Sequence, residues 1–190
     1  MTASPPLIEL HRHLEGSIRP QTTLALAERF GLPLPRALDE LRPMVQVTTP
    51  EPDLMAFIAK VDTATSALGD LDACARIAYE AVEDARNEGI AYLELRFTPL
   101  YMAAAHTLDP HGVVEAVVDG TRRGARDFGV RVQRIGILNR TFGPETARRE
   151  LEILLDHREA FVALDLAGDE ARFPGDLFVD HFRRGRDAGW

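Results

Sequence analysis

The feature that most constrains the fold is an alternation between short apolar runs and longer amphipathic stretches. Four runs have the length and composition of buried strands, and glycine, proline or charged residues bound each of them: residues 7–13, 90–97, 130–138 and 161–167. The stretches between these runs carry apolar residues at helical spacing. Strands that alternate with helices predict parallel βα units, so the pattern favours an α/β fold with about four parallel strands.

The helical stretches are unevenly distributed along the chain. Apolar spacing predicts helices over these segments: residues 24–30, 54–68, 74–85, 114–128 and 147–155. Three of them fall between the first and second strands, which predicts a helical insertion over about residues 20–89. Gly89 and Gly129 each precede an apolar residue that opens a strand, and the chain ends Gly189-Trp190. If this pattern continues, Trp190 is the first residue of a fifth strand. The alternative is a natural C-terminus after a fraying helix.

Composition limits the classes of protein that fit. The 190 residues are enough for one domain with a core, although a closed eight-stranded (β/α) barrel typically needs about 250. A formal net charge of −8 argues against nucleic acid or an acidic membrane as a partner. Cys74 is the single cysteine, and neither a secretory signal nor a membrane-spanning apolar run is evident. These features predict a cytoplasmic protein.

A histidine pair closes the first predicted strand. Residues two apart on a strand share a face, so His11 and His13 point the same way. Two imidazoles at this spacing can hold one metal ion, and zinc is the usual choice for nitrogen ligands. Catalytic zinc normally has three protein ligands, so the pair is an incomplete site; a chance pair is the alternative. Glu15 follows at the end of the strand, as a site residue or a solvated loop carboxylate.

Other polar residues have plainer interpretations. Glu94 and Arg96 share a strand face, which favours an ion pair between them. Asp165 and Asp169 lie near the end of the fourth strand and fit a supporting or capping role. The remaining histidines show no ligand spacing and are expected at the surface or at helix ends: His106, His111, His157 and His181.

Three segments together resemble a known family. The first is Ile8-Glu9-Leu10-His11-Arg12-His13-Leu14-Glu15-Gly16-Ser17 with Arg19-Pro20, the second is Glu94-Leu95-Arg96-Phe97-Thr98-Pro99, and the third is Ala163-Leu164-Asp165-Leu166-Ala167-Gly168-Asp169-Glu170. In this order and at these separations they resemble the first half of the adenosine deaminase family. The resemblance implies that the chain is the first half of a zinc-dependent (β/α)₈ TIM barrel, an incomplete metal-dependent hydrolase domain over residues 1–190.

The resemblance also implies roles for four residues. His11 and His13 would be two ligands of one Zn²⁺ ion, and His13 would also lie beside the substrate. Glu15 stands where the family binds a ribose hydroxyl, often with aspartate. Gly168 would bring its backbone against the N3 edge of the purine, where a side chain would block the ring. No catalytic residue is assigned within the chain, because the family's third histidine ligand and its proton-donor glutamate are expected beyond Trp190.

The implied activity of the intact protein is hydrolysis of adenosine, or a related 6-aminopurine nucleoside, to inosine and ammonia. One alternative is deamination of another aminopurine, such as adenine or aminodeoxyfutalosine. A second alternative is a non-catalytic half-barrel fragment, because the 190-residue chain alone is expected to be inactive. The edges of a half-barrel are unpaired, so self-association through them is expected.

Overall fold

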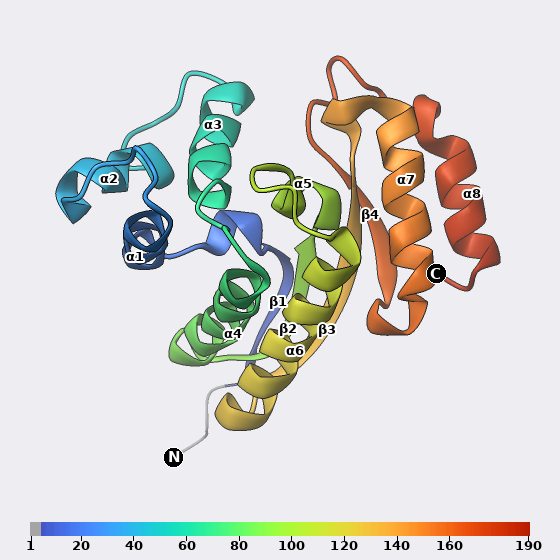
Figure 1. The fold of residues 1–190 in the computed structure, drawn as a ribbon. Helices are drawn as coiled ribbons and strands as arrows, with labels where there is room; N and C mark the ends of the chain where they lie inside the picture. Colours follow the sequence, from blue (N-terminus) through green and yellow to red (C-terminus); the bar gives the residue numbers. More distant parts are fainter. Residues whose placement is uncertain (1–4) are drawn as a thin grey trace.

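A computed structural model describes residues 5–190 (Figure 1). The first four residues, part of the segment in which no secretory signal is evident, lie outside the described residues. The strands are β1 (Leu7–His13), β2 (Ile90–Phe97), β3 (Arg131–Asn139) and β4 (Ala163–Ala167). They form one parallel sheet in the order β1-β2-β3-β4. The four predicted parallel strands are therefore confirmed, with the last two beginning one and two residues later than expected.

Helices connect the strands and extend beyond their ends. The α-helices are α1 (Pro20–Phe30), α2 (Leu38–Val45), α3 (Leu54–Thr65), α4 (Leu71–Asn87), α5 (Pro99–Ala104), α6 (Pro110–Phe128), α7 (Gly143–Asp156) and α8 (Val179–Asp187). Short 3₁₀ turns are η1 (Glu15–Ser17), η2 (Arg140–Phe142), η3 (Arg158–Ala160) and η4 (Gly175–Phe178). No helix of residues 5–190 combines the length and apolar character needed to cross a membrane.

The segment between β1 and β2 holds four α-helices, so the prediction of three was wrong. The missed helix is α2, which has eight residues, carries Pro43 inside it and buries only Leu41. Proline removes a backbone donor and interrupts helical periodicity, which explains why the sequence pattern did not indicate it. Helix α5, directly after β2, was also missed; it is only six residues long.

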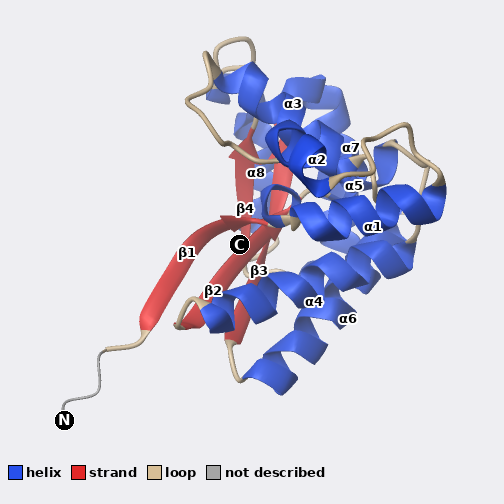
Figure 2. Cartoon of the chain, turned by 90° about the vertical axis from the view of Figure 1, so that its left-hand side faces the viewer, coloured by secondary structure: helices blue, strands red, loops and turns tan. Residues whose placement is uncertain are grey.

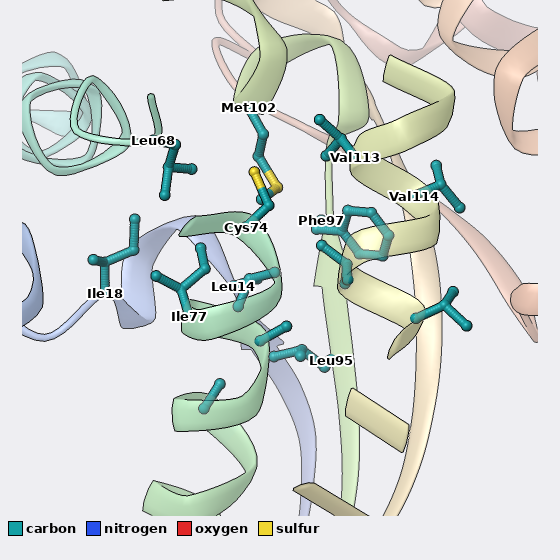
Figure 3. Close-up of a cluster of buried hydrophobic side chains, with 14 of the residues drawn as sticks. Leu14, Ile18, Leu68, Cys74, Ile77, Leu95, Phe97, Met102, Val113 and Val114 are labelled. Carbon is teal, nitrogen blue, oxygen red and sulfur yellow. The ribbon is translucent and has the colours of Figure 1, made fainter. Parts of the chain in front are cut away.

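The core lies between β2 and the two long helices α4 and α6. Figure 3 shows Leu95 and Phe97 of β2 among Cys74 and Ile77 of α4 and Val113 and Val114 of α6, all buried. The helices approach closely at Gly120, where an added Cβ would lie 2.2 Å from the carbonyl oxygen of Ala75. This packing fixes the outer face of the sheet, as expected for βα units, and leaves Cys74 in a structural position.

Both edges of the sheet are unpaired within the described chain. Strands β1 and β4 each have one neighbour, and Figure 2 shows β1 at the outer edge with the helices gathered on its other side. Three apolar residues of β1 are exposed: Leu7 at 57%, Ile8 at 64% and Leu10 at 55%. An apolar edge strand is a template for pairing with another chain. The curled, open sheet is consistent with half of a (β/α)₈ barrel.

We therefore expect the 190-residue chain, expressed by itself, to self-associate through β1. Ile8→Lys should weaken this association, because a lysine on an edge strand opposes further pairing. Sedimentation velocity across a concentration series measures the effect. Met44→Lys changes an exposed apolar residue of α2 and serves as the matched control. A chain that stays monomeric at every concentration, or equal effects of the two substitutions, would contradict the expectation.

Candidate functional site

The predicted histidine pair meets at the C-terminal end of β1. The Nε2 atoms of His11 and His13 lie 3.3 Å apart. Zn–N bonds of about 2.1 Å in tetrahedral geometry separate two ring nitrogens by about 3.4 Å, so the pair fits a shared zinc ion. Burial lowers the pKa of His13, and the positive charges of His11 and Arg96 lower it further. A lowered pKa favours the neutral imidazole that a metal ion requires.

A carboxylate from β4 completes the only cluster of three metal-binding side chains within residues 5–190. One oxygen of Asp165 and ring nitrogens of His11 and His13 lie within 4.8 Å of one another. Carboxylate oxygen and imidazole nitrogen are both zinc ligands, so the donor set fits the ion. Sequence reasoning gave Asp165 only a supporting or capping role, because the curl that brings β4 toward β1 is not visible in the pattern.

Arg96 of β2 links the two strands that carry this cluster, β1 and β4. Its side chain is buried, and it donates through Nη1 to Asp165 Oδ2 at 2.7 Å and through Nη2 to the Leu10 carbonyl at 2.7 Å. The expected Glu94–Arg96 ion pair is therefore wrong. Glu94 instead accepts from the Tyr92 hydroxyl at 2.9 Å, on the other side of Glu94 along the strand. The curl of the sheet places Asp165 within reach of Arg96.

Glu15 lies in η1 and is 4% exposed, so of its two alternative interpretations the solvated loop carboxylate is wrong. Its Oε1 accepts from the Thr98 N–H at 2.6 Å, while Oε2 is buried without a hydrogen-bond partner in the described chain. Burial raises the pKa of Glu15 to about 7, although hydrogen bonds from backbone N–H groups oppose the shift. An unpartnered buried carboxyl oxygen at a cavity is a candidate for contact with a ligand hydroxyl.

Gly168 follows β4 with φ of +116°, a conformation that favours glycine. An added Cβ would lie 2.4 Å from Thr141 Oγ1 and 2.8 Å from Asn139 Oδ1. Glycine is thus required by the protein's own contacts, a reason that sequence reasoning did not supply. Asp169 is capping, since its Oδ1 accepts from the Arg172 N–H at 3.2 Å.

Three of the predicted residues line one cavity of about 360 Å³: His13, Glu15 and Gly168. Its other lining residues come mainly from α3 and from the ends of β2 and β3: Gly16, Leu54, Met55, Phe57, Ile58, Val61, Asp62, Thr98, Tyr101, Ile137, Asn139, Thr141, Phe142 and Ala167. The volume suits a small organic ligand. Sequence reasoning assigned none of these residues to the site, although the apolar face of the 54–68 helix was visible.

The walls of the cavity have distinct chemistry. Helix α3 supplies an apolar wall, and the Tyr101 hydroxyl of α5 donates to Asp62 of α3. The ends of β1, β3 and β4 supply polar groups and the glycine backbone. An apolar wall facing a few fixed polar groups is the usual design of a small-molecule site, so this cavity is the candidate active site.

The other histidines lie outside this cavity, as their spacing suggested, but two details differ from expectation. His111 Nδ1 and His157 Nε2 lie 3.1 Å apart, so these residues form a pair between α6 and the end of α7. His181 is buried in α8, and its Nε2 lies 2.9 Å from the Pro144 carbonyl. Contacts between helices decide both placements, and spacing along the sequence does not reveal them.

Glu150 carries a second buried carboxyl group. Glu150 of α7 accepts from the Leu100 N–H at 3.0 Å, and it is 2% exposed. Burial raises the pKa of Glu150 to about 8, and the negative charge of Glu15 contributes in the same direction. The folded chain therefore keeps the Glu150 carboxyl group protonated at neutral pH, where an ordinary carboxyl group is ionised.

This burial gives stability a predictable dependence on pH. The unfolded chain releases the Glu150 proton near its ordinary pKa of 4.5, whereas the folded chain holds it up to about 8. Between these values each such group lowers the unfolding free energy by about 1.4 kcal/mol per pH unit as pH rises. Glu150→Gln should remove one such contribution, flattening the decline measured by urea unfolding from pH 5 to 8. Glu145→Gln, at an exposed position, is the control; equal slopes in the two variants would contradict the prediction.

Comparison with known proteins places this geometry in a family. The family model described as adenosine deaminase matches residues 6–190. An adenosine deaminase of Yersinia enterocolitica is 56% identical over 186 residues, which are 97% of this chain and 56% of that protein. The chain thus spans little more than half the length of this relative.

Solved structures agree on the fold. An amidohydrolase from Burkholderia ambifaria with bound Zn superposes with a TM-score of 0.87 at 28% identity, over 97% of this chain and 50% of that one. An adenine deaminase from Arthrobacter aurescens gives a TM-score of 0.87 at 26% identity, over 98% of this chain and 56% of that one. The half-barrel sheet with its histidine pair, together with a family match over nearly the whole chain, shows that the chain belongs to the adenosine deaminase family.

Proposed function

We propose that the whole protein containing residues 1–190 is a zinc-dependent hydrolase that deaminates adenosine or a related 6-aminopurine nucleoside. The observation that carries this proposal is the arrangement of His11 and His13 at the edge of a cavity that Glu15 and Gly168 also line. The Yersinia relative's name supports adenosine as the substrate, and its identity to this chain is twice that of the Arthrobacter adenine deaminase.

Each residue of the site would have a role that suits its chemistry. His11 and His13 would hold the ion, with Asp165 as a further oxygen donor or as the group that fixes their surroundings through Arg96. When bound, zinc supplies the Lewis-acid chemistry that makes water nucleophilic near neutral pH. Glu15 offers its unpartnered oxygen to a sugar hydroxyl. Gly168 lines the cavity at the end of β4, where its backbone would lie against the purine ring.

The proposal extends to the domain that holds this site, its cellular location and its partner. We place residues 1–190 within a single barrel domain, with the third histidine ligand and the proton-donor glutamate outside them. A cytoplasmic location follows from the single buried cysteine, which suits a reducing compartment. The partner is a small nucleoside; the net charge of −8 gives no reason to propose nucleic acid.

The zinc assignment predicts that His11→Ala removes the ion from the protein expressed from its complete gene. One nitrogen ligand fewer leaves the site short of the three protein ligands that catalytic zinc requires. Zinc per chain after dialysis, measured by plasma emission spectrometry, is the readout. His106→Gln changes a histidine outside the cavity and should retain the wild-type zinc content. Unchanged zinc in His11→Ala would remove the ligand assignment.

The activity prediction compares that protein with residues 1–190 expressed alone. The absorbance change from adenosine to inosine should proceed at on the order of 1–10³ per second for the former and be undetectable for the latter. Adenine and aminodeoxyfutalosine, tested in parallel, identify the alternative substrates. Turnover at enzymatic rates by the isolated chain would contradict its expected inactivity. Absence of activity on every aminopurine would favour the non-catalytic fragment.

A further inference from the structure

Asn139 is a polar residue of the cavity that the proposed function leaves without a role. It is the last residue of β3, it pairs in register with Ala167 of β4, and it is partly exposed in the cavity that His13 and Glu15 also line. The ends of parallel strands are where barrel enzymes place groups that contact ligands. An amide at this position can therefore contribute to ligand recognition.

The orientation of the Asn139 amide is fixed by its neighbour. Its Oδ1 accepts from the Thr141 N–H at 3.0 Å. A backbone N–H can only donate, so the carboxamide oxygen must face Thr141 and the NH₂ group must point away from it. Within residues 5–190 no protein acceptor is hydrogen bonded to that NH₂ group. Asn139 thus offers an amide donor to a ligand.

The turn that holds Asn139 is itself braced against β4. Thr141 Oγ1 accepts from the Asp169 N–H at 2.9 Å, which links η2 to the segment after β4. The Asn139 oxygen lies only 2.8 Å from the position that a Cβ on Gly168 would occupy. The Asn139 carboxamide is therefore held beside Gly168, with its oxygen facing Gly168 and Thr141, before any ligand arrives. A group that is already oriented loses little entropy when it binds.

We propose that Asn139 donates a hydrogen bond through its amide to a hydroxyl oxygen of the nucleoside's sugar. This inference rests on the proposed function, in which the Gly168 backbone lies against the purine N3 edge. N3 and the glycosidic nitrogen N9 are both bonded to C4, so the sugar begins beside that edge. Asn139, whose carboxamide lies beside Gly168, would then be within reach of the sugar, and Glu15 has an unpartnered oxygen in the same cavity.

The test begins with Asn139→Asp in the protein expressed from its complete gene. Aspartate keeps an oxygen for the Thr141 N–H and removes the amide donor, so the turn is retained. Loss of one such hydrogen bond should lower kcat/KM for adenosine roughly 10- to 100-fold with little change in Tm. Asn139→Ala, which introduces neither a charge nor a donor, should show at least the same loss. Asn87→Asp makes the same chemical change at an exposed position on α4 and is the control.

Substrate analogues decide whether the sugar is what Asn139 contacts. With whichever of 2′-deoxyadenosine, 3′-deoxyadenosine and 5′-deoxyadenosine lacks the contacted oxygen, the variants and the wild type should agree within about threefold, since the interaction is already absent. Equal losses on adenosine and all three deoxynucleosides, or a fall in Tm with unchanged kcat/KM, would overturn the proposal. If the wild type is inactive on every aminopurine, the proposed function fails first and this inference fails with it.

Discussion

The site depends on the ion pair and the hydrogen bond that the buried guanidinium of Arg96 makes. This group joins its own strand, β2, to Asp165 of β4 and to the β1 backbone at Leu10. A charge buried to this extent is tolerated only while it is paired, and removing one partner of such a pair typically costs about 3–5 kcal/mol. The same contacts hold the β1 segment that carries His11 and His13 near the carboxylate of β4. The metal-binding cluster therefore depends both on the curl of the sheet and on the Arg96 contacts that cross it.

Much of the fold follows from the periodicity of the sequence, because buried strands and amphipathic helices impose strong patterns. The four strands and the long helices α4 and α6 are of this kind. Helix α2 escaped prediction, since Pro43 and a single buried leucine leave no periodic signal. The resemblance to a family added what periodicity cannot give, namely that the four strands belong to a barrel, whereas the strand period alone already indicated that His11 and His13 share a face.

The site was less predictable than the fold for a geometrical reason. His11, His13 and Glu15 lie close together in the sequence, so one motif indicates them. Tyr101, Asn139 and the apolar face of α3 reach the same cavity only because the sheet curls and the inserted helices cover its end. The Glu94–Arg96 pair illustrates the error that follows from local reasoning: proximity along one strand was outweighed by a carboxylate two strands away.

The polar groups at the ends of the strands also bear on how the cavity would select a ligand under the proposed function. Glu15 is held by Thr98, and Asn139 is held by Thr141, so each presents one remaining polar atom in a fixed direction. Such groups stay unsatisfied when a ligand lacks the matching atom, and leaving a buried polar group unpaired costs about 1–3 kcal/mol. An apolar wall such as α3 discriminates far less between ligands of similar shape. Under the proposed function, selectivity for a nucleoside over a free base would therefore come from the strand ends, where the backbone fixes the polar groups.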